Sequence, residues 1–321
     1  MKIKRPRILV IGANPALQKN LLFRDFRPGT VNRAFACSSY ASGKGINFLK
    51  AANIMQNDCT LLQFSGSEEG AFITRELDNL DISHLTINTV AATRSCITCL
   101  NEQSSEMTEL IEPSGEITSE EKQLFCRILE QNIDKFDAVA ACGTCPASNS
   151  DSEELYNFIA KTAQKNNKPL LLDACMNTHR ALNNNQIEIL KINFTEAQEL
   201  TKTKNIFAVI SYFRRNCKIR HIAITDGPNK AYLAGCGGEI LSFYIPQLNN
   251  VKNPLGAGDT ASAALLTEFL KTRNIAESFT TALAAASASC LSLYCADFNL
   301  ETLNKIKKQI IIRKITPPTV D

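Results

Sequence analysis

The sequence has no apolar run that approaches the roughly 20 residues needed to cross a bilayer. The apolar stretch near its amino end, residues 8–13, is shorter than the hydrophobic region of a secretory signal peptide and has no small-residue cleavage site after it. These absences argue against a membrane span and a secretory signal. We therefore expect a cytoplasmic protein whose first apolar stretch is a strand.

An excess of charge of either sign is also missing. The chain has 35 basic and 32 acidic residues, a net charge of +3, and the two signs are interspersed. This balance predicts neither nucleic-acid nor membrane binding. With 44% hydrophobic and 21% charged residues, the composition is that of a folded globular protein.

Motifs of several common enzyme classes are absent. No Gly-x-Gly-x-x-Gly follows the first predicted strand, which argues against a dinucleotide fold. Lys44 does not belong to a P-loop, because residues 34–42 contain no glycine and Gly45 replaces the required Ser or Thr. The three histidines lie in no catalytic motif, so Cys-His catalysis is disfavoured.

The twelve cysteines are scattered through apolar segments, where a reducing compartment would keep them as small buried hydrophobic residues. Two Cys-x-x-Cys pairs raise the alternative of a zinc site. Cys96 and Cys99 fall on a predicted strand, whose odd offset sends them to opposite faces. Cys142 and Cys145 fall in a predicted loop. Zinc is the less favoured interpretation.

Apolar, strand-like runs alternate with segments of helical period through most of the chain. Strands are predicted at 7–13, 61–64, 138–141, 169–173, 187–192 and 219–225, and helices at 44–56, 120–131, 153–164, 195–201, 259–270 and 276–293. This alternation predicts the α/β class, with a mostly parallel central sheet covered by helices on both faces.

Short strand-like segments within about 14–42 and 92–112 interrupt the alternation. The period-two pattern of Cys96, Thr98 and Leu100 favours a small antiparallel β flap, or lid, that stands off the main sheet. No linker or repeat divides the chain, so residues 1–321 are expected to form one domain. Because a flap has free strand edges, we also expect a homodimer through it.

The strongest motif is the segment Asn253–Thr260, which leads into an apolar helix. Gly256 and Gly258 allow a tight turn, so that backbone N–H groups converge at the helix start and form an anion site. Asp259 beside it could accept the proton of a hydroxyl that attacks a phosphoryl group. The bland alternative is a glycine loop with a capping Asp.

This segment resembles the signature of the PfkB (ribokinase-like) carbohydrate kinases, and six further segments resemble the same family in the same order. They are Asn14–Leu17 (its NPAxD segment), Ser42–Asn47 (GGKGxN), Thr93-Arg94 with Thr108–Leu110 (the flap of the branch that takes phosphorylated hexoses), Gly143–Pro146 (GSLP), Lys191–Glu196 (KPNxxE) and Thr225–Gly227 (the nucleotide-binding TxG turn). The nearest branch is 1-phosphofructokinase and tagatose-6-phosphate kinase.

The resemblance implies an ATP-dependent kinase with Asp259 as the base. The amides of Gly256, Ala257 and Gly258 would stabilise charge on the γ-phosphoryl group. The nucleotide would contact Lys191, Asn193, Thr225, Gly227 and Gly258. The side chains of Asn193 and Glu196 would hold Mg²⁺ through water.

On the acceptor side, the resemblance implies a sugar, with a ketohexose phosphate as the expected substrate. The sugar would contact Asn14, Gln18, Gly43, Lys44 and Asn47. Arg94 would hold the phosphate already on the substrate, since a guanidinium fork matches phosphate oxygens.

One departure from the family pattern leaves the sugar's identity open. Gln18 stands where the family has a carboxylate, and an amide offers one acceptor oxygen and two donors. Two other classes of function therefore remain. A nucleoside or unphosphorylated-sugar kinase would keep Asp259 but would not need Arg94. A non-catalytic sugar or nucleotide sensor would bind without turnover.

Overall fold

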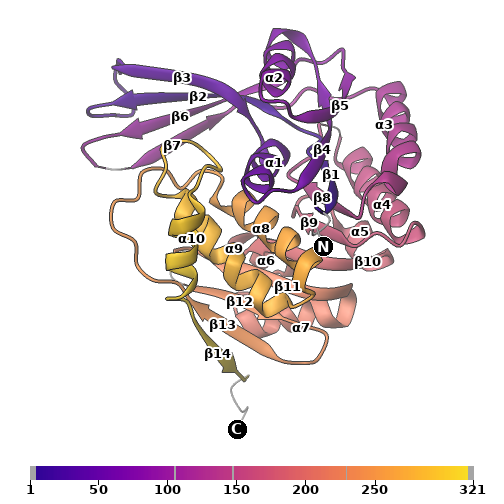
Figure 1. The fold of residues 1–321 in the computed structure, drawn as a ribbon. Helices are drawn as coiled ribbons and strands as arrows, with labels where there is room; N and C mark the ends of the chain where they lie inside the picture. The colour runs from indigo at the N-terminus through magenta and orange to yellow at the C-terminus, as the bar shows by residue number, and fades with distance from the viewer. Residues whose placement is uncertain (1–4, 105, 147, 229, 317–321) are drawn as a thin grey trace.

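The computed structural model describes residues 5–104, 106–146, 148–228 and 230–316, which form two β-sheets with surrounding helices (Figure 1). The large sheet has ten strands in the described chain. Their spatial order is β14 (Ile311–Ile315), β13 (Ile240–Tyr244), β12 (Lys230–Ala234), β11 (Lys218–Asp226), β10 (Gln186–Asn193), β9 (Leu170–Asp173), β8 (Ala138–Cys142), β1 (Arg7–Ile11), β4 (Asp58–Ser65) and β5 (Ser83–Asn88). Every pair from β11 to β5 is parallel, and β12, β13 and β14 are antiparallel. The predicted α/β class is confirmed.

Helices cover both faces of this sheet. They are α1 (Lys44–Ile54), α2 (Ser67–Asn79), α3 (Ser119–Asn132), the 3₁₀ turn η1 (Ile133–Lys135), α4 (Asn149–Lys165), α5 (His179–Asn184), α6 (Phe194–Thr201), α7 (Ile206–Asn216), α8 (Ala257–Thr272), α9 (Ile275–Ser289) and α10 (Leu300–Lys307). Among the described residues no helix is long and apolar enough to cross a membrane.

Two hydrophobic clusters lie on the two faces of the sheet. One includes Phe48 of α1, Leu265 of α8 and Phe279 of α9. The other includes Phe125 of α3 and Phe213 of α7. All five residues of β8 are buried between them. This explains why the central strands read as continuous apolar runs rather than alternating ones.

The lid is a separate sheet of four strands, in the order β3 (Ala36–Ser42), β2 (Ala16–Phe23), β6 (Arg94–Asn101) and β7 (Met107–Ile111), and it projects to one side of the main sheet (Figure 1). The β2–β3 and β6–β7 pairs are antiparallel, as expected. The central β2–β6 pair is parallel, because both strands leave the body of the molecule in the same direction.

One predicted helix ends early. Helix α9 stops at Ser289 instead of residue 293. The carbonyl oxygen of Cys290 accepts hydrogen bonds from the backbone N–H groups of Lys252 and Asn253, and the Asn253 side chain donates to the carbonyl of Leu293. These bonds to the segment before the glycine motif replace helical ones, although the sequence pattern continues to be apolar.

Candidate active site

The glycine motif forms the start of α8. Gly256 has the left-handed φ of +76°, and a Cβ there would lie 2.1 Å from Cys295 Sγ, so no other residue fits. The prediction that the Ala257 amide is available is wrong, because its N–H donates to the carbonyl oxygen of Pro254 at 3.2 Å. Among the described residues, the backbone N–H groups of Gly258 and Asp259 have no hydrogen-bond partner. Two donors and the positive end of the helix dipole are therefore available to an anion at this point.

Asp259 is buried next to these donors, with 7% of its surface exposed. Its Oδ2 accepts a hydrogen bond of 2.8 Å from Asn47 Nδ2, which fixes the carboxylate. Burial raises the pKa of Asp259 to about 6; the Asp173 carboxylate adds to this rise, and Lys44 and Asn47 oppose it. A carboxylate with this pKa is a better proton acceptor near neutral pH than an exposed one.

Asp173, at the carboxyl end of β9, is a site residue that sequence reasoning missed. Its Oδ1 accepts from Lys44 Nζ at 3.0 Å, and its Oδ2 accepts from Lys191 Nζ at 3.3 Å and from the Ser262 hydroxyl. The available signal was its place at the end of a predicted buried strand, since the carboxyl ends of parallel strands meet at one edge of the sheet.

This carboxylate holds two ammonium groups beside the helix start. Burial alone would raise the pKa of Asp173, but Lys191 and Lys44 lower it to about 2, so it stays ionised. Burial alone would lower the pKa of Lys44, but the carboxylates of Asp173, Asp259 and Glu196 together raise this pKa above its ordinary value. Lys191 Nζ lies 3.1 Å from the position that a Cβ on Gly258 would take. Positive charge is thus fixed against the anion site.

Asn193 and Glu196 form a reciprocal capping box at the start of α6. Glu196 N–H donates to Asn193 Oδ1 at 2.8 Å, and Asn193 N–H donates to Glu196 Oε2 at 2.9 Å. The other oxygen of Glu196 lies 3.4 Å from Lys44 Nζ. In the described chain no group of three or more His, Cys, Asp or Glu side chains could hold a metal by itself. A part-exposed carboxylate fits a hydrated Mg²⁺, which binds few protein oxygens directly.

The other residues that were predicted to contact the nucleotide lie at the same edge of the sheet. Thr225 of β11 is paired in register with Asn193 of β10. Gly227, in the β11–β12 turn, has a φ of +64° and open space around it. Lys191, Asn193, Thr225 and Gly227 therefore lie at the ends of two adjacent strands.

Gln18 belongs to a buried polar ladder on the lid. Its Nε2 donates to Thr98 Oγ1 at 2.7 Å and lies 3.3 Å from Asn20 Oδ1. Asn20 Nδ2 in turn donates to the Tyr40 hydroxyl at 3.1 Å. The ladder crosses strands β3, β2 and β6. Sequence reasoning missed Asn20, Tyr40 and Thr98, because their neighbourhood depends on strand register.

Arg94 begins β6, opposite Ala16 of β2. Its Nε is buried and has no hydrogen-bond partner among the described residues. An unpaired buried donor is costly, so this guanidinium is available to a ligand. Gly43, at the start of α1, has a φ of +117°, and a Cβ there would lie 3.0 Å from Pro15 Cα. It lets the start of α1 approach the base of the lid.

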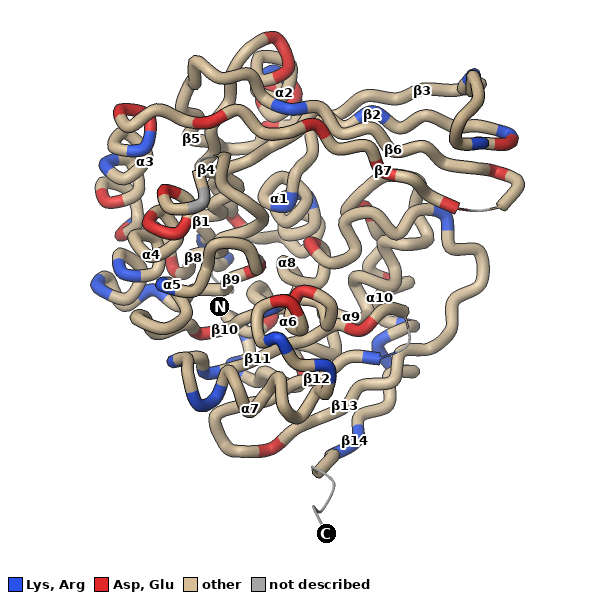
Figure 2. The backbone as a smooth tube through the Cα atoms, turned by 180° about the vertical axis from the view of Figure 1, so that it is seen from behind, with Lys and Arg blue, Asp and Glu red and all other residues tan. Residues whose placement is uncertain are grey.

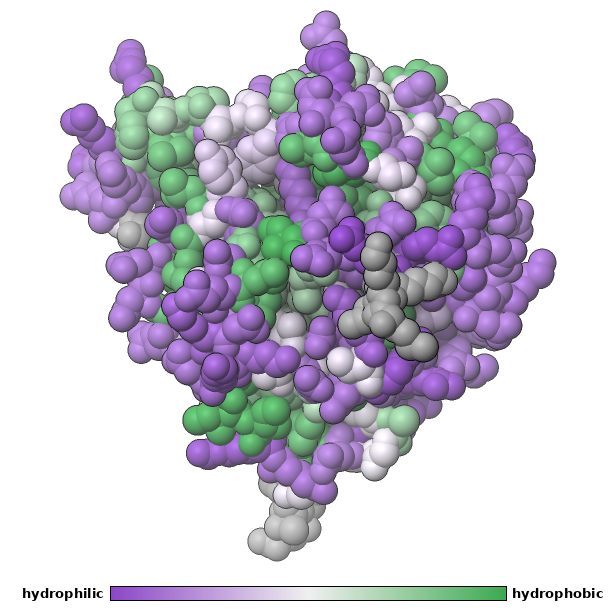
Figure 3. All heavy atoms as spheres, in the orientation of Figure 1, coloured by the Kyte–Doolittle hydropathy of each residue, from purple (hydrophilic) through white to green (hydrophobic). Residues whose placement is uncertain are grey.

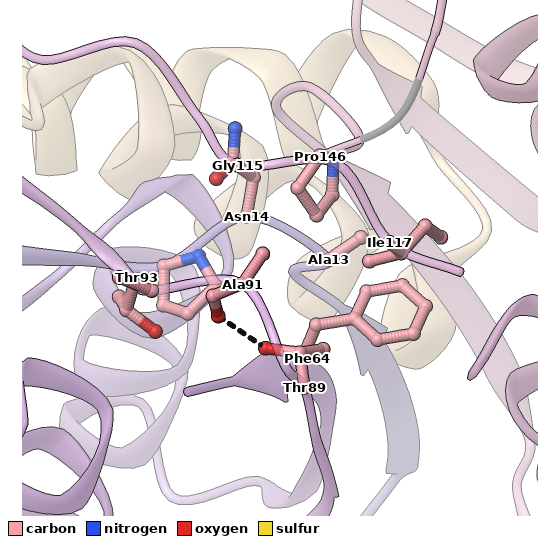
Figure 4. A pocket seen from close by; sticks show the side chains of 11 residues that line it. Ala13, Asn14, Phe64, Thr89, Ala91, Thr93, Gly115, Ile117 and Pro146 are labelled. Carbon is pink, nitrogen blue, oxygen red and sulfur yellow. Dashed lines mark hydrogen bonds between the residues drawn. The ribbon is translucent and has the colours of Figure 1, made fainter. Parts of the chain in front are cut away.

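Asn14 is held rather than free. Its Nδ2 donates to Ser114 Oγ at 2.7 Å and to Thr144 Oγ1 at 2.8 Å. It also lines a cavity of about 20 Å³, shown in Figure 4, where Pro146 and Gly115 lie across from Phe64. That volume suits one water and not a sugar. The Asn14 amide nitrogen therefore ties the segment after β1 to two neighbouring loops.

A model of the pfkB family carbohydrate kinases matches residues 8–303. A possible 1-phosphofructokinase of Thermotoga maritima superposes with a TM-score of 0.86 at 18% identity, over 97% of this chain and 100% of that one. Phosphofructokinase-2 of Escherichia coli, solved in complex with potassium, superposes with a TM-score of 0.82 at 19% identity, over 95% of this chain and 99% of that one. A carbohydrate kinase of Agrobacterium tumefaciens superposes with a TM-score of 0.73 at 18% identity, over 96% of this chain and 100% of that one. Because the family model spans most of its length, the chain belongs to the pfkB family of carbohydrate kinases, phosphotransferases that act on an alcohol group.

Proposed function

We propose that this protein transfers the γ-phosphoryl group of ATP to a hydroxyl of a ketohexose phosphate. The observation that carries the proposal is the buried Asp259 carboxylate, which accepts a hydrogen bond from Asn47. Beside it lie the backbone N–H groups of Gly258 and Asp259, which have no hydrogen-bond partner among the described residues. A proton acceptor and an anion site meet there, as phosphoryl transfer to an alcohol requires.

In the proposed step, Asp259 accepts the proton of the acceptor hydroxyl while the oxygen of that hydroxyl forms a bond to the γ-phosphorus. The bond from that phosphorus to the bridging oxygen of ATP breaks, and ADP leaves with the electron pair. The helix-start N–H groups, with Lys191 and Lys44 nearby, stabilise negative charge on the transferring group. These donors are already oriented before the reaction, so the step costs little reorganisation.

Nucleotide and metal would occupy the adjoining strand ends. Lys191, Asn193, Thr225, Gly227 and Gly258 would contact ATP. Glu196, with the Asn193 side chain beside it, would hold a hydrated Mg²⁺, which neutralises phosphate charge when bound. The capping box fixes Glu196 in place for this task.

Arg94 supports a phosphorylated acceptor. Its Nε lacks a partner in the described chain, at the base of the lid next to the ladder that contains Gln18. A structure of phosphofructokinase-2 of Escherichia coli in complex with fructose-6-phosphate matches with a TM-score of 0.80 at 19% identity. Gln18, a neutral amide fixed by Thr98, would select among sugars.

An acceptor panel tests this proposal. ADP release with Mg-ATP is measured for ketohexose phosphates, free sugars and nucleosides. Turnover is expected on a ketohexose phosphate. Turnover on nucleosides alone would favour the nucleoside-kinase alternative. ATP binding without turnover on any acceptor would favour a sensor and contradict the proposal.

The lid also supports a homodimer. Val31, Phe35, Leu110 and Ile111 of the lid expose more than half of their surface. Figure 3 shows hydrophobic patches over this part of the molecule. The outer edges of β3 and β7 pair with no strand of the described chain. Free edges beside exposed apolar side chains are typical of a subunit contact.

A further inference from the structure

A groove lies at the edge of the main sheet opposite to Asp259. It has a volume of about 420 Å³ and is formed by the amino ends of β9, β10 and β11 together with the carboxyl ends of α4 and α8. Lys168, Arg220 and Arg273 line it, against the single carboxylate of Glu188. Figure 2 shows further basic residues near the end of α7 and the start of β11. The lining therefore carries an excess of positive charge.

Two of the three cations keep unused donor capacity. Lys168 Nζ donates to the carbonyl oxygens of Phe136 at 2.7 Å and Asp134 at 3.3 Å, which fixes it and leaves its third N–H. The Arg273 guanidinium stacks on the Phe269 ring at 5.5 Å. Its side chain donates no hydrogen bond to any described residue.

The third cation is held at the rim. Arg220 Nε lies 3.7 Å from Glu188 Oε2, and 57% of the Arg220 side chain is exposed. The Gln186 side-chain oxygen, in the amide orientation that satisfies both groups, accepts from Arg220 Nε at 2.6 Å and from Arg220 Nη2 at 3.1 Å. Gln186 and Glu188 together therefore orient this guanidinium without enclosing it. A fork that is oriented and open to solvent loses little entropy when it binds an anion.

We propose that this basal groove binds a small anionic molecule that carries a phosphate group. Arg220, Arg273 and Lys168 would meet the phosphate oxygens, because guanidinium forks and ammonium groups form strong charge-assisted bonds with them. The amides of Gln164 and Asn167, which also line the groove, would meet hydroxyl or carbonyl groups. The volume lies within the range of about 300–1,000 Å³ typical of ligand pockets.

The groove is distinct from the catalytic site but built on the same elements. Helix α8 has 16 residues, starts at the glycine motif and is capped by Arg273. At 1.5 Å per residue, its two ends are about 24 Å apart. Strand β9 likewise begins at the groove and ends at Asp173. A ligand in the groove would contact elements that also position the catalytic groups.

Isothermal titration with inorganic pyrophosphate, without divalent metal, tests this inference independently of the proposed acceptor. The Arg220→Gln/Arg273→Asn variant should weaken one binding event at least about tenfold, as loss of charged hydrogen bonds predicts. Asn is chosen because position 273 has a φ of +55°, which Asn tolerates. Lys168→Gln is the second variant and should weaken the same event.

Lys218→Gln is the matched control, since Lys218 is exposed at the start of β11 but does not line the groove. Lys218→Gln should leave the pyrophosphate isotherm unchanged. Arg94→Ala should leave the binding event that is assigned to the groove unchanged. Unchanged binding in both groove variants would overturn the inference. Loss of the event in Arg94→Ala alone would assign it to the catalytic site and overturn the inference equally.

Discussion

At the scale of single residues, the site depends on carboxylates placed in opposite electrostatic surroundings. Asp173 contacts two lysines and a hydroxyl, and its pKa falls to about 2. Asp259 receives one amide hydrogen bond and no direct ion pair in the described chain, and its pKa rises to about 6. One carboxylate therefore stays charged and positions cations, while the other can exchange a proton in the working range.

As pH rises through about 6, ionisation of Asp259 should increase activity, because the carboxylate is the proton acceptor, and should decrease stability. Its folded pKa exceeds the unfolded value near 4, so stability falls as pH rises from about 4 through about 6. Above that window the buried charge costs about 3 kcal/mol. Asp259→Asn should therefore raise Tm more at pH 8 than at pH 4.5, which thermal unfolding measures. A lower Tm at pH 8 would contradict this.

Arg94 should act on phosphorylated acceptors alone. Arg94→Ala removes a guanidinium whose Nε has no hydrogen-bond partner in the described chain, so the fold should keep its Tm. KM for the sugar phosphate should rise roughly 10- to 150-fold, as charged hydrogen bonds predict. Arg33→Ala, an exposed residue of the same lid, is the control for steady-state kinetics. An equal rise in the control would argue against phosphate recognition by Arg94.

At the scale of elements, the start of α8 depends on a single glycine. Gly256 combines a positive φ with contact to Cys295, which lies in the segment that follows α9. The glycine motif is thus fixed both by its own backbone and by a segment about forty residues later in the chain.

Gly256→Ala should lower both Tm and kcat, because the new methyl group collides with Cys295 Sγ. The Gly256→Ala/Cys295→Ala double variant should recover part of the Tm, since only the backbone strain of about 1–2 kcal/mol would remain. Thermal unfolding of these two variants and of Cys295→Ala gives a double-mutant cycle for positions 256 and 295. Strictly additive losses would show that the collision does not determine the cost.

Much of this element order could be predicted from local pattern. Apolar runs and helical periods predicted the central strands, α1, α3, α4 and α8, and the glycine motif predicted that α8 begins next to it. The end of α9 could not be predicted, because hydrogen bonds from Lys252 and Asn253 determine it. Asp173 was missed because its place at the end of a predicted strand was the only signal, and its contacts with Lys44 and Lys191 depend on residues far apart in the sequence. The parallel β2–β6 pair and the Gln18 ladder depend on contacts about eighty residues apart.

At the scale of the whole molecule, the lid stands apart from the main sheet and exposes apolar side chains on its edge strand β7. A lone four-stranded sheet with such an edge gains stability by pairing or packing against another surface. Association through the lid would also help to fix the strands that carry Gln18 and Arg94.

Light scattering at micromolar concentration should therefore give the mass of a dimer. Leu110→Glu should shift the mass to that of the 35.3 kDa monomer, because it places a charge in the apolar contact. Leu300→Glu, at an exposed leucine of α10 outside the lid, should leave the dimer intact. A monomeric wild-type protein would remove the dimer proposal.

The central claim is that Asp259 accepts the proton of the acceptor hydroxyl during phosphoryl transfer. The most direct test compares kcat of the wild-type protein and Asp259→Asn by ADP release on the best acceptor, with ATP affinity measured in both. Loss of a positioned base should lower kcat by about 10²–10⁴ with ATP affinity retained. A kcat within about threefold of wild type would contradict the account, because a factor of three corresponds to well under 1 kcal/mol of barrier.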